Sequence, residues 1–86
     1  MEEIDIEGAS HMPFIHVRAY SGRDLDTKKK AASAIVKAAS ETMGVPETAF
    51  TMVYEDVDRD VWEKEVVETI IEPLRDKMLI EHGKLV

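Results

Sequence analysis

The dipeptide Met12-Pro13 could carry chemistry, because removal of a methionine that precedes a proline leaves a secondary amine at the start of the chain. A free α-amino group has a pKa of roughly 7.7–8.0, and burial or a nearby cation lowers it by disfavouring the ammonium form. An amine tuned in this way is a general base at neutral pH. The dipeptide alone does not identify such a site, so the surrounding sequence has to supply the context.

The other reactive side chains form no recognisable site. His16 and His82 have neither a cysteine nor a second histidine at ligand spacing, which argues against a metal site. The acidic segment Glu55–Asp60 lacks the glycine and the closing glutamate of a calcium loop, so we interpret it as a solvated loop. No serine lies in a Gly-x-Ser-x-Gly context.

Two segments predict β-strands. In residues 13–20, apolar side chains occupy every second position, so they would lie on one face of a strand. Residues 48–55 are rich in β-branched and aromatic side chains, which favour strands. The apolar side of the first strand carries Ile15, Val17 and Ala19. Because a helical pattern separates the two segments, we predict a β-α-β unit with parallel strands and a right-handed crossover.

The intervening helix has signals at both ends. Asp24 and Asp26 offer N-caps, and apolar residues then recur at helical spacing as far as Met43. Gly44 is a natural C-cap, and Pro46 prevents the helix from continuing.

A second helix is predicted to begin at Asp60, where Glu63 three residues later completes a capping box. Pro73 should kink this helix or end its first part near Glu72. Its apolar side chains recur every four residues, at Trp62, Val66, Ile70, Leu74 and Met78.

Length and composition exclude several classes of protein. A chain of 86 residues forms at most one small domain with a marginal core, which favours oligomerisation. Cysteine is absent, so there are no disulfides or thiolate metal sites. The net charge of −7 argues against a general nucleic-acid binder, and no apolar run is long enough for a membrane span or a signal peptide. We expect a cytoplasmic protein.

The first twelve residues differ in character from the rest. Gly8-Ala9-Ser10-His11 before a second methionine indicates an expression-tag leader, residues 1–12, in front of a single domain, residues 13–86. The leader holds four of the 18 acidic residues, which leaves 14 against 11 basic residues and a net charge of −3. Ile4 and Ile6 flank Asp5 in a strand-like alternation, which predicts pairing with a sheet edge.

The segment Pro13–Arg23 resembles the opening of the 4-oxalocrotonate tautomerase family, whose members begin with a catalytic proline and close their first strand with a Gly-Arg pair. Gly22 and Arg23 stand nine and ten residues after Pro13, at the offsets of that pair. The resemblance covers residues 13–62, and its further matches are Gly44-Val45-Pro46, the second-strand end Tyr54-Glu55, and the aromatic Trp62 at the position of a hydrophobic pocket residue.

Two departures qualify this resemblance. Thr51 stands where the best-known members carry a second-strand arginine that serves a neighbouring subunit's site. The chain also runs into a helix after Trp62 and lacks the usual Gly-rich hairpin there, as does a longer bacterial subgroup in which some members are dimers. Both departures argue against a muconate-type dicarboxylate substrate and leave the proline chemistry untouched.

The resemblance implies a tautomerase, an isomerase that moves a proton between the keto and enol forms of a small 2-hydroxy or 2-oxo acid. Pro13 would be the general base, which is blocked while the leader is attached to it. Arg23 would hold a carboxylate or enolate oxygen, Trp62 would form a dry wall, and His16 and Tyr54 are further candidate polar contacts. An amine and an arginine suffice for this reaction, so no cofactor or metal is implied.

The expected fold is a tautomerase-like β-α-β unit plus a C-terminal helix. The resemblance implies a homodimer with a four-stranded sheet and helices on one face, and a hexamer is the alternative. Two other functions remain open. One is a related enzyme that uses the same proline for hydration, dehalogenation or decarboxylation, and the other is a non-catalytic oligomeric binding module.

Overall fold

The computed structural model describes residues 12–86, so the predicted leader and the predicted strand at Ile4–Ile6 lie outside the described residues. The chain divides into two compact units at the junction of Asp56 and Val57. The N-terminal unit contains the predicted β-α-β element, and the C-terminal unit, Val57–Val86, contains the second helical region.

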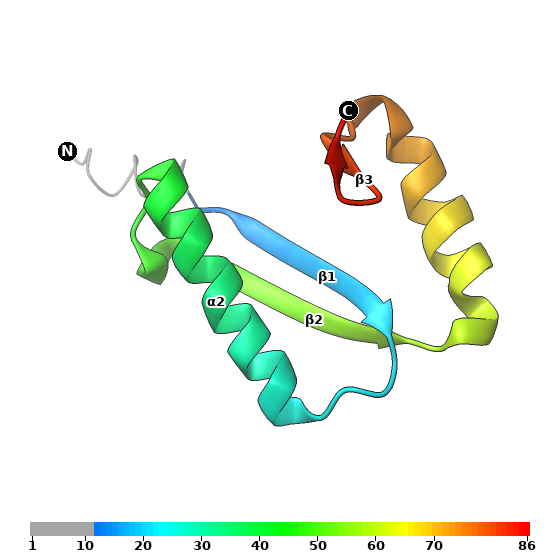
Figure 1. The fold of residues 1–86 in the computed structure, drawn as a ribbon, viewed down its shortest axis with the longest axis horizontal. Coiled ribbons are helices and arrows are strands. Elements are labelled where there is room, and N and C mark those ends of the chain that lie inside the picture. Colours follow the sequence, from blue (N-terminus) through cyan, green and yellow to red (C-terminus); the bar gives the residue numbers. More distant parts are fainter. Residues whose placement is uncertain (1–11) are drawn as a thin grey trace. The chain divides into compact units, whose positions relative to one another are not determined.

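The N-terminal unit is a two-stranded parallel sheet and one long helix (Figure 1). Strand β1 runs over Phe14–Tyr20, helix α2 over Leu25–Met43, and strand β2 over Thr51–Val57. The predicted fold class is confirmed, with parallel strands as expected. Each strand has only one hydrogen-bonded neighbour among the described residues, so both edges of the sheet are open there.

Helix α2 begins and ends where the sequence predicts. The Asp24 carboxylate accepts a 2.8 Å hydrogen bond from the backbone N–H of Thr27, which also lowers the pKa of that carboxyl group. At the other end, Gly44 adopts the left-handed conformation and donates its N–H to the carbonyl of Ser40, at 3.0 Å.

The two sides of the sheet have different environments. Met52 and Tyr54 project from β2 toward α2, and Lys28 of the helix pairs with Asp56 at 2.8 Å. His16 and Glu55 are in contact on the other side, as strand alternation requires. The side away from α2 is largely open, with Phe14 62% exposed.

Strand β2 begins and ends later than predicted. Glu47–Ala49 forms a single 3₁₀ turn, η1, in which Ala49 and Phe50 donate to the carbonyls of Pro46 and Glu47. This turn takes up residue 48, so the strand begins only at Thr51. It continues through Val57, whose side chain is buried, so the interpretation of residues 55–60 as one loop is wrong in its first half.

The second helical region has the predicted break but not the predicted start. A 3₁₀ turn, η2, occupies Arg59–Val61 and contains Asp60, so Asp60 is not an N-cap. The N-cap residues of η2 and of the helix that follows are Asp58 and Trp62, and neither makes a side-chain capping hydrogen bond, so the predicted capping box is not formed. The wide helix η3, Glu63–Ile71, follows with π-type hydrogen bonds, and the 3₁₀ helix η4 occupies Glu72–Lys77. The helix changes from the π type to the 3₁₀ type next to Pro73, as expected because proline has no backbone N–H to donate to the preceding turn.

A C-terminal hairpin was missed by the sequence analysis. Strand β3, Ile80–Glu81, pairs antiparallel with β4, Lys84–Leu85. His82 and Gly83 have φ values of 52° and 82°, which fits a type I′ turn. The sequence signal for this hairpin is the pair His82-Gly83 between two short segments.

Arg75 links this hairpin to the helix before it. Its guanidinium contacts the carboxylates of Glu72 and Glu81, at 3.0 and 2.6 Å. These contacts raise the pKa of Arg75 and lower that of Glu81.

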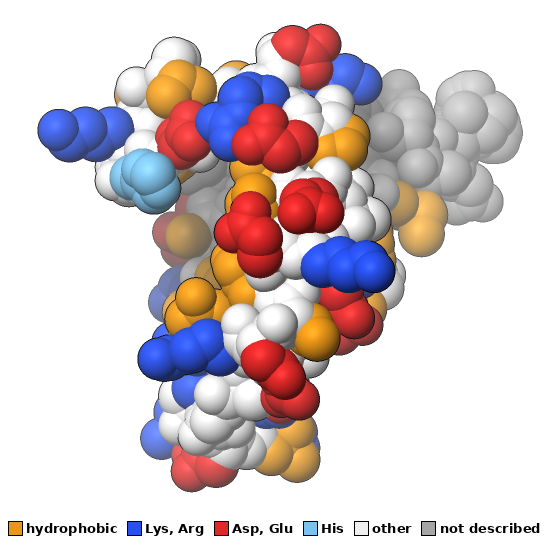
Figure 2. All heavy atoms as spheres, turned by 90° about the vertical axis from the view of Figure 1, so that its right-hand side faces the viewer, with side chains coloured by type: hydrophobic (Ala, Val, Ile, Leu, Met, Phe, Trp, Pro, Cys, Tyr) orange, Lys and Arg blue, Asp and Glu red, His pale blue; other side chains and the backbone are white. Residues whose placement is uncertain are grey.

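Much apolar surface remains uncovered. Val45, Val57 and Val66 are the buried hydrophobic residues of the described chain, whereas large side chains such as Leu79 and Leu85 are 75% and 82% exposed. Figure 2 shows hydrophobic side chains reaching the surface between acidic and basic ones. No helix in residues 12–86 is long and apolar enough to cross a membrane.

Candidate functional site

Pro13 lies directly before β1 and is half-buried. Its carbonyl accepts a 3.2 Å hydrogen bond from the backbone N–H of Thr51. Proline has no backbone N–H, and it is tolerated here because a residue before the first residue of β1 does not need to donate a hydrogen bond to the neighbouring strand. The hydrogen bond fixes Pro13 at the start of the parallel sheet.

Thr51 is the first residue of β2, and its side chain is exposed. The parallel register therefore brings two of the predicted site residues, Pro13 and Thr51, to the same end of the sheet. Thr51 offers a hydroxyl there and no charge.

Arg23 lies at the other end of β1. It follows Gly22, whose φ of 131° favours glycine, and it directly precedes the N-cap of α2. Its Nη1 donates to the carbonyl of Tyr20 at 3.2 Å, and its side chain is exposed (Figure 1 shows this turn in cyan, after the β1 arrowhead). The seven residues of β1 span roughly 20 Å, so Arg23 cannot contact Pro13 of its own chain.

Trp62 belongs to the C-terminal unit. It lies between η2 and η3, is half-buried, and donates its backbone N–H to the carbonyl of Arg59. Of the predicted site residues, the structure brings only Pro13 and Thr51 together within one unit. Arg23 lies at the other end of β1, and Trp62 belongs to the other unit.

His16 and Tyr54, the two further candidates, lie on opposite sides of the sheet. His16 is part of a charged cluster that the sequence analysis did not identify: its Nε2 donates to Glu55 Oε1 at 2.5 Å, and Arg18 Nε lies 3.2 Å from the same oxygen. These neighbours, His16 above all, lower the pKa of Glu55. This contact follows from the register of β1 and β2, which places His16 beside Glu55. The sequence analysis predicted parallel strands but no register, so it did not predict the contact.

Among residues 12–86, no three histidine, aspartate or glutamate side chains lie close enough together to hold a metal ion.

The family model described as Tautomerase enzyme matches residues 13–69, which is most of the chain and begins at Pro13. No solved structure matches.

Proposed function

This chain belongs to the Tautomerase family of isomerases, and we propose that it moves a proton between the keto and enol forms of a small 2-oxo acid with Pro13 as the base. The observation that carries the proposal is the match beginning at Pro13, together with the fixed place of that residue at the start of the sheet.

Pro13 acts through its nitrogen when the chain begins at this residue. The free secondary amine takes a proton from the enol hydroxyl or from the carbon next to the carbonyl, and the resulting ammonium returns it elsewhere on the conjugated system. In the 86-residue chain the same nitrogen is part of the Met12–Pro13 amide. Its lone pair is delocalised into the carbonyl, so it cannot act as a base.

Arg23 would bind the carboxylate or enolate oxygen of the substrate. Its planar guanidinium can donate two parallel hydrogen bonds to a carboxylate. Because β1 separates Arg23 from Pro13 of the same chain, the arginine has to come from another copy. The site we propose is thus shared between protomers.

A homodimer is the simplest assembly that meets this requirement, and a hexamer is the alternative. Among residues 12–86 both edges of the sheet are unpaired and several large hydrophobic residues are exposed, which supports such a partner. In this assembly Thr51 would lie beside the amine as an uncharged contact, and Trp62 would exclude water from it. A drier surrounding lowers the pKa of the amine toward neutrality.

The test compares the 86-residue chain with one that begins at Pro13, in a spectrophotometric assay of phenylenolpyruvate ketonisation. We expect the Pro13-initiated chain to be active and the longer chain to be inactive. A chain that begins with alanine in place of Pro13 retains a primary amine, so its activity should fall without vanishing. Equal rates from the two proline-containing forms would exclude the N-terminal amine as the base.

A further inference from the structure

Phe14 is an exposed aromatic side chain that directly follows the proposed base. It is the first residue of β1, and its side chain is 62% exposed although it is fully apolar. A single exposed apolar residue is common on protein surfaces, so its exposure alone assigns no role to it. Its position is more informative, because consecutive Cα atoms are about 3.8 Å apart and the ring is therefore attached beside Pro13.

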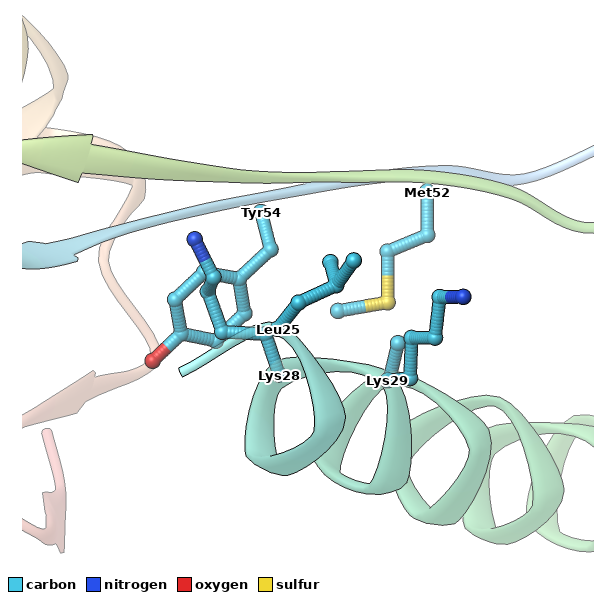
Figure 3. Close-up of a pocket in the computed structure, with 6 residues that line it drawn as sticks. Leu25, Lys28, Lys29, Met52 and Tyr54 are labelled. Atoms are coloured by element: carbon cyan, nitrogen blue, oxygen red, sulfur yellow. The ribbon is translucent and has the colours of Figure 1, made fainter. Parts of the chain in front are cut away.

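Phe14 and Thr51 lie on the same side of the sheet, away from α2. Met52 and Tyr54 project from β2 toward α2 (Figure 3), and Thr51, one residue before Met52, faces the opposite side. The N–H of Thr51 donates to the carbonyl of Pro13 at 3.2 Å, and in a parallel pair this hydrogen bond places Thr51 beside Phe14. The proposed amine is therefore flanked by a phenyl ring and by an uncharged hydroxyl side chain.

The Phe14 ring is supported on one side by His16. The centroids of the two rings are 6.0 Å apart and their planes are inclined by 53°, within the range of favourable aromatic pairs. His16 is in turn hydrogen-bonded to Glu55 of β2. A ring that is already held in place loses less rotational freedom when a ligand packs against its open side, which favours binding there.

We propose that Phe14 selects substrates with an aryl group on the carbon that exchanges its proton, an inference that rests on the proposed function of Pro13. This carbon, C3 of a 2-oxo acid, lies at the Pro13 nitrogen during proton transfer. Any substituent on C3 is consequently held next to the amine, where an aryl group packs against the open side of Phe14. The carboxylate is attached to C2, at the opposite end of the substrate, and extends toward Arg23 of the second copy.

Size and charge narrow the class of substrate. A methyl group on C3 buries less apolar area against Phe14 than a ring does. A carboxylate on C3 would lose hydration without gaining an ion pair, because neither Phe14 nor Thr51 carries a charge. We therefore expect phenylpyruvate to be preferred over 2-oxobutanoate, which has the same reacting atoms and a methyl group in place of the ring.

The experiment follows the exchange of the C3 protons of these two acids in D₂O by proton NMR, with the chain that begins at Pro13. The amine takes a proton from C3, and the electron pair of the broken C–H bond moves to the carbonyl oxygen as the enolate. The ammonium exchanges with the solvent and returns a deuteron to C3. Dividing each kcat/KM by the uncatalysed rate constant of the same acid corrects for intrinsic acidity, and we expect the corrected value to be about tenfold higher for phenylpyruvate.

Variants of Phe14 test the contact. Phe14→Ala should lower kcat/KM for phenylpyruvate about tenfold, mainly through KM because the aryl group does not react, and should change the value for 2-oxobutanoate less than about twofold. Phe14→Tyr keeps the ring and should retain the preference. The matched control is Ile35→Ala, which truncates another partly exposed apolar side chain in the middle of α2 and should leave both values unchanged.

The outcomes separate this inference from the proposed function. Equal losses for both acids in Phe14→Ala, or a loss that lies entirely in kcat, would overturn the role of Phe14. If circular dichroism shows that this variant does not fold, Phe14→Leu decides, because it keeps an apolar side chain and should still reduce the aryl preference about threefold. Exchange of both acids without an aryl preference would refute only the role of Phe14, whereas exchange of neither acid would refute the proposed function and this inference with it.

Discussion

Pro13 and Arg23 lie at opposite ends of β1, separated by the whole of Phe14–Tyr20 and the turn at Ser21-Gly22. The strand is rigid and extended, so no rotation of the arginine side chain brings its guanidinium to the proline of the same chain. A reaction that uses both groups needs two copies of the chain, and this requirement can be tested directly.

Subunit mixing tests the shared site. One parent begins at Pro13 and carries Arg23→Ala, and the other keeps residues 1–12, so its proline is blocked while its Arg23 is intact. Each alone should lose activity, the first by about 10- to 100-fold in kcat/KM through loss of a charged hydrogen-bonding pair. After co-refolding at equal amounts, about a quarter of the dimer sites combine a free proline with the partner's arginine. Activity no greater than the sum of the two parents would show that Arg23 does not serve a neighbouring site.

Thr51 should restrict the substrate range. Its backbone holds Pro13, and its side chain adds no charge at this end of the sheet, so a distal carboxylate gains no ion pair from it. We expect the chain that begins at Pro13 to turn over monocarboxylate enols better than 2-hydroxymuconate. Thr51→Arg should shift the ratio of kcat/KM values toward the dicarboxylate, and Thr51→Val serves as the uncharged control. A wild-type preference for the dicarboxylate would mean that another cation takes this role.

Sedimentation equilibrium should give the mass of a dimer, about twice the 9.7 kDa of one chain. The physical reason is that the part of the chain the structure describes has a two-stranded sheet with unpaired edges and few buried side chains, and such a sheet is marginally stable alone. A mass of one chain at micromolar concentration would contradict both the dimer and the shared site, whereas a sixfold mass would favour the hexamer.

Glu55 should contribute to stability in a pH-dependent way. Contacts with His16 and Arg18 hold its pKa below the ordinary value of 4.5, so the native state binds this proton less tightly than the unfolded state. Glu55 therefore stabilises the fold at pH values above 4.5, the pKa of an ordinary glutamate. This stabilisation is lost as the pH falls through the lower pKa that Glu55 has in the folded protein. Glu55→Gln should therefore make the fall of Tm between about pH 5 and pH 3 shallower.

The control for this prediction is Glu47→Gln, in a turn where no ion pair to Glu47 is formed among the described residues. It removes the same kind of charge without the contacts. If both variants make the fall of Tm at acidic pH shallower by the same amount, the cause is the overall charge of the protein. The contacts of Glu55 with His16 and Arg18 would then contribute nothing specific.

The sequence by itself determined the elements whose causes are local. The alternation of β1, the Asp24 and Gly44 caps of α2, and the break at Pro73 follow from side-chain period, capping and a missing N–H. The candidate base is equally a property of sequence, because only the identity of residue 13 supplies a secondary amine. Each of these features depends on residues within a few positions of one another.

The tertiary structure decided what depends on distant residues. The register of β1 and β2 placed Thr51 beside Pro13 and Glu55 beside His16, and it kept Arg23 at the far end. Residues 55–57 read as a polar loop in sequence, yet pairing and the burial of Val57 extend β2 through them. Backbone pairing and burial are non-local, and they override local propensity wherever the two conflict.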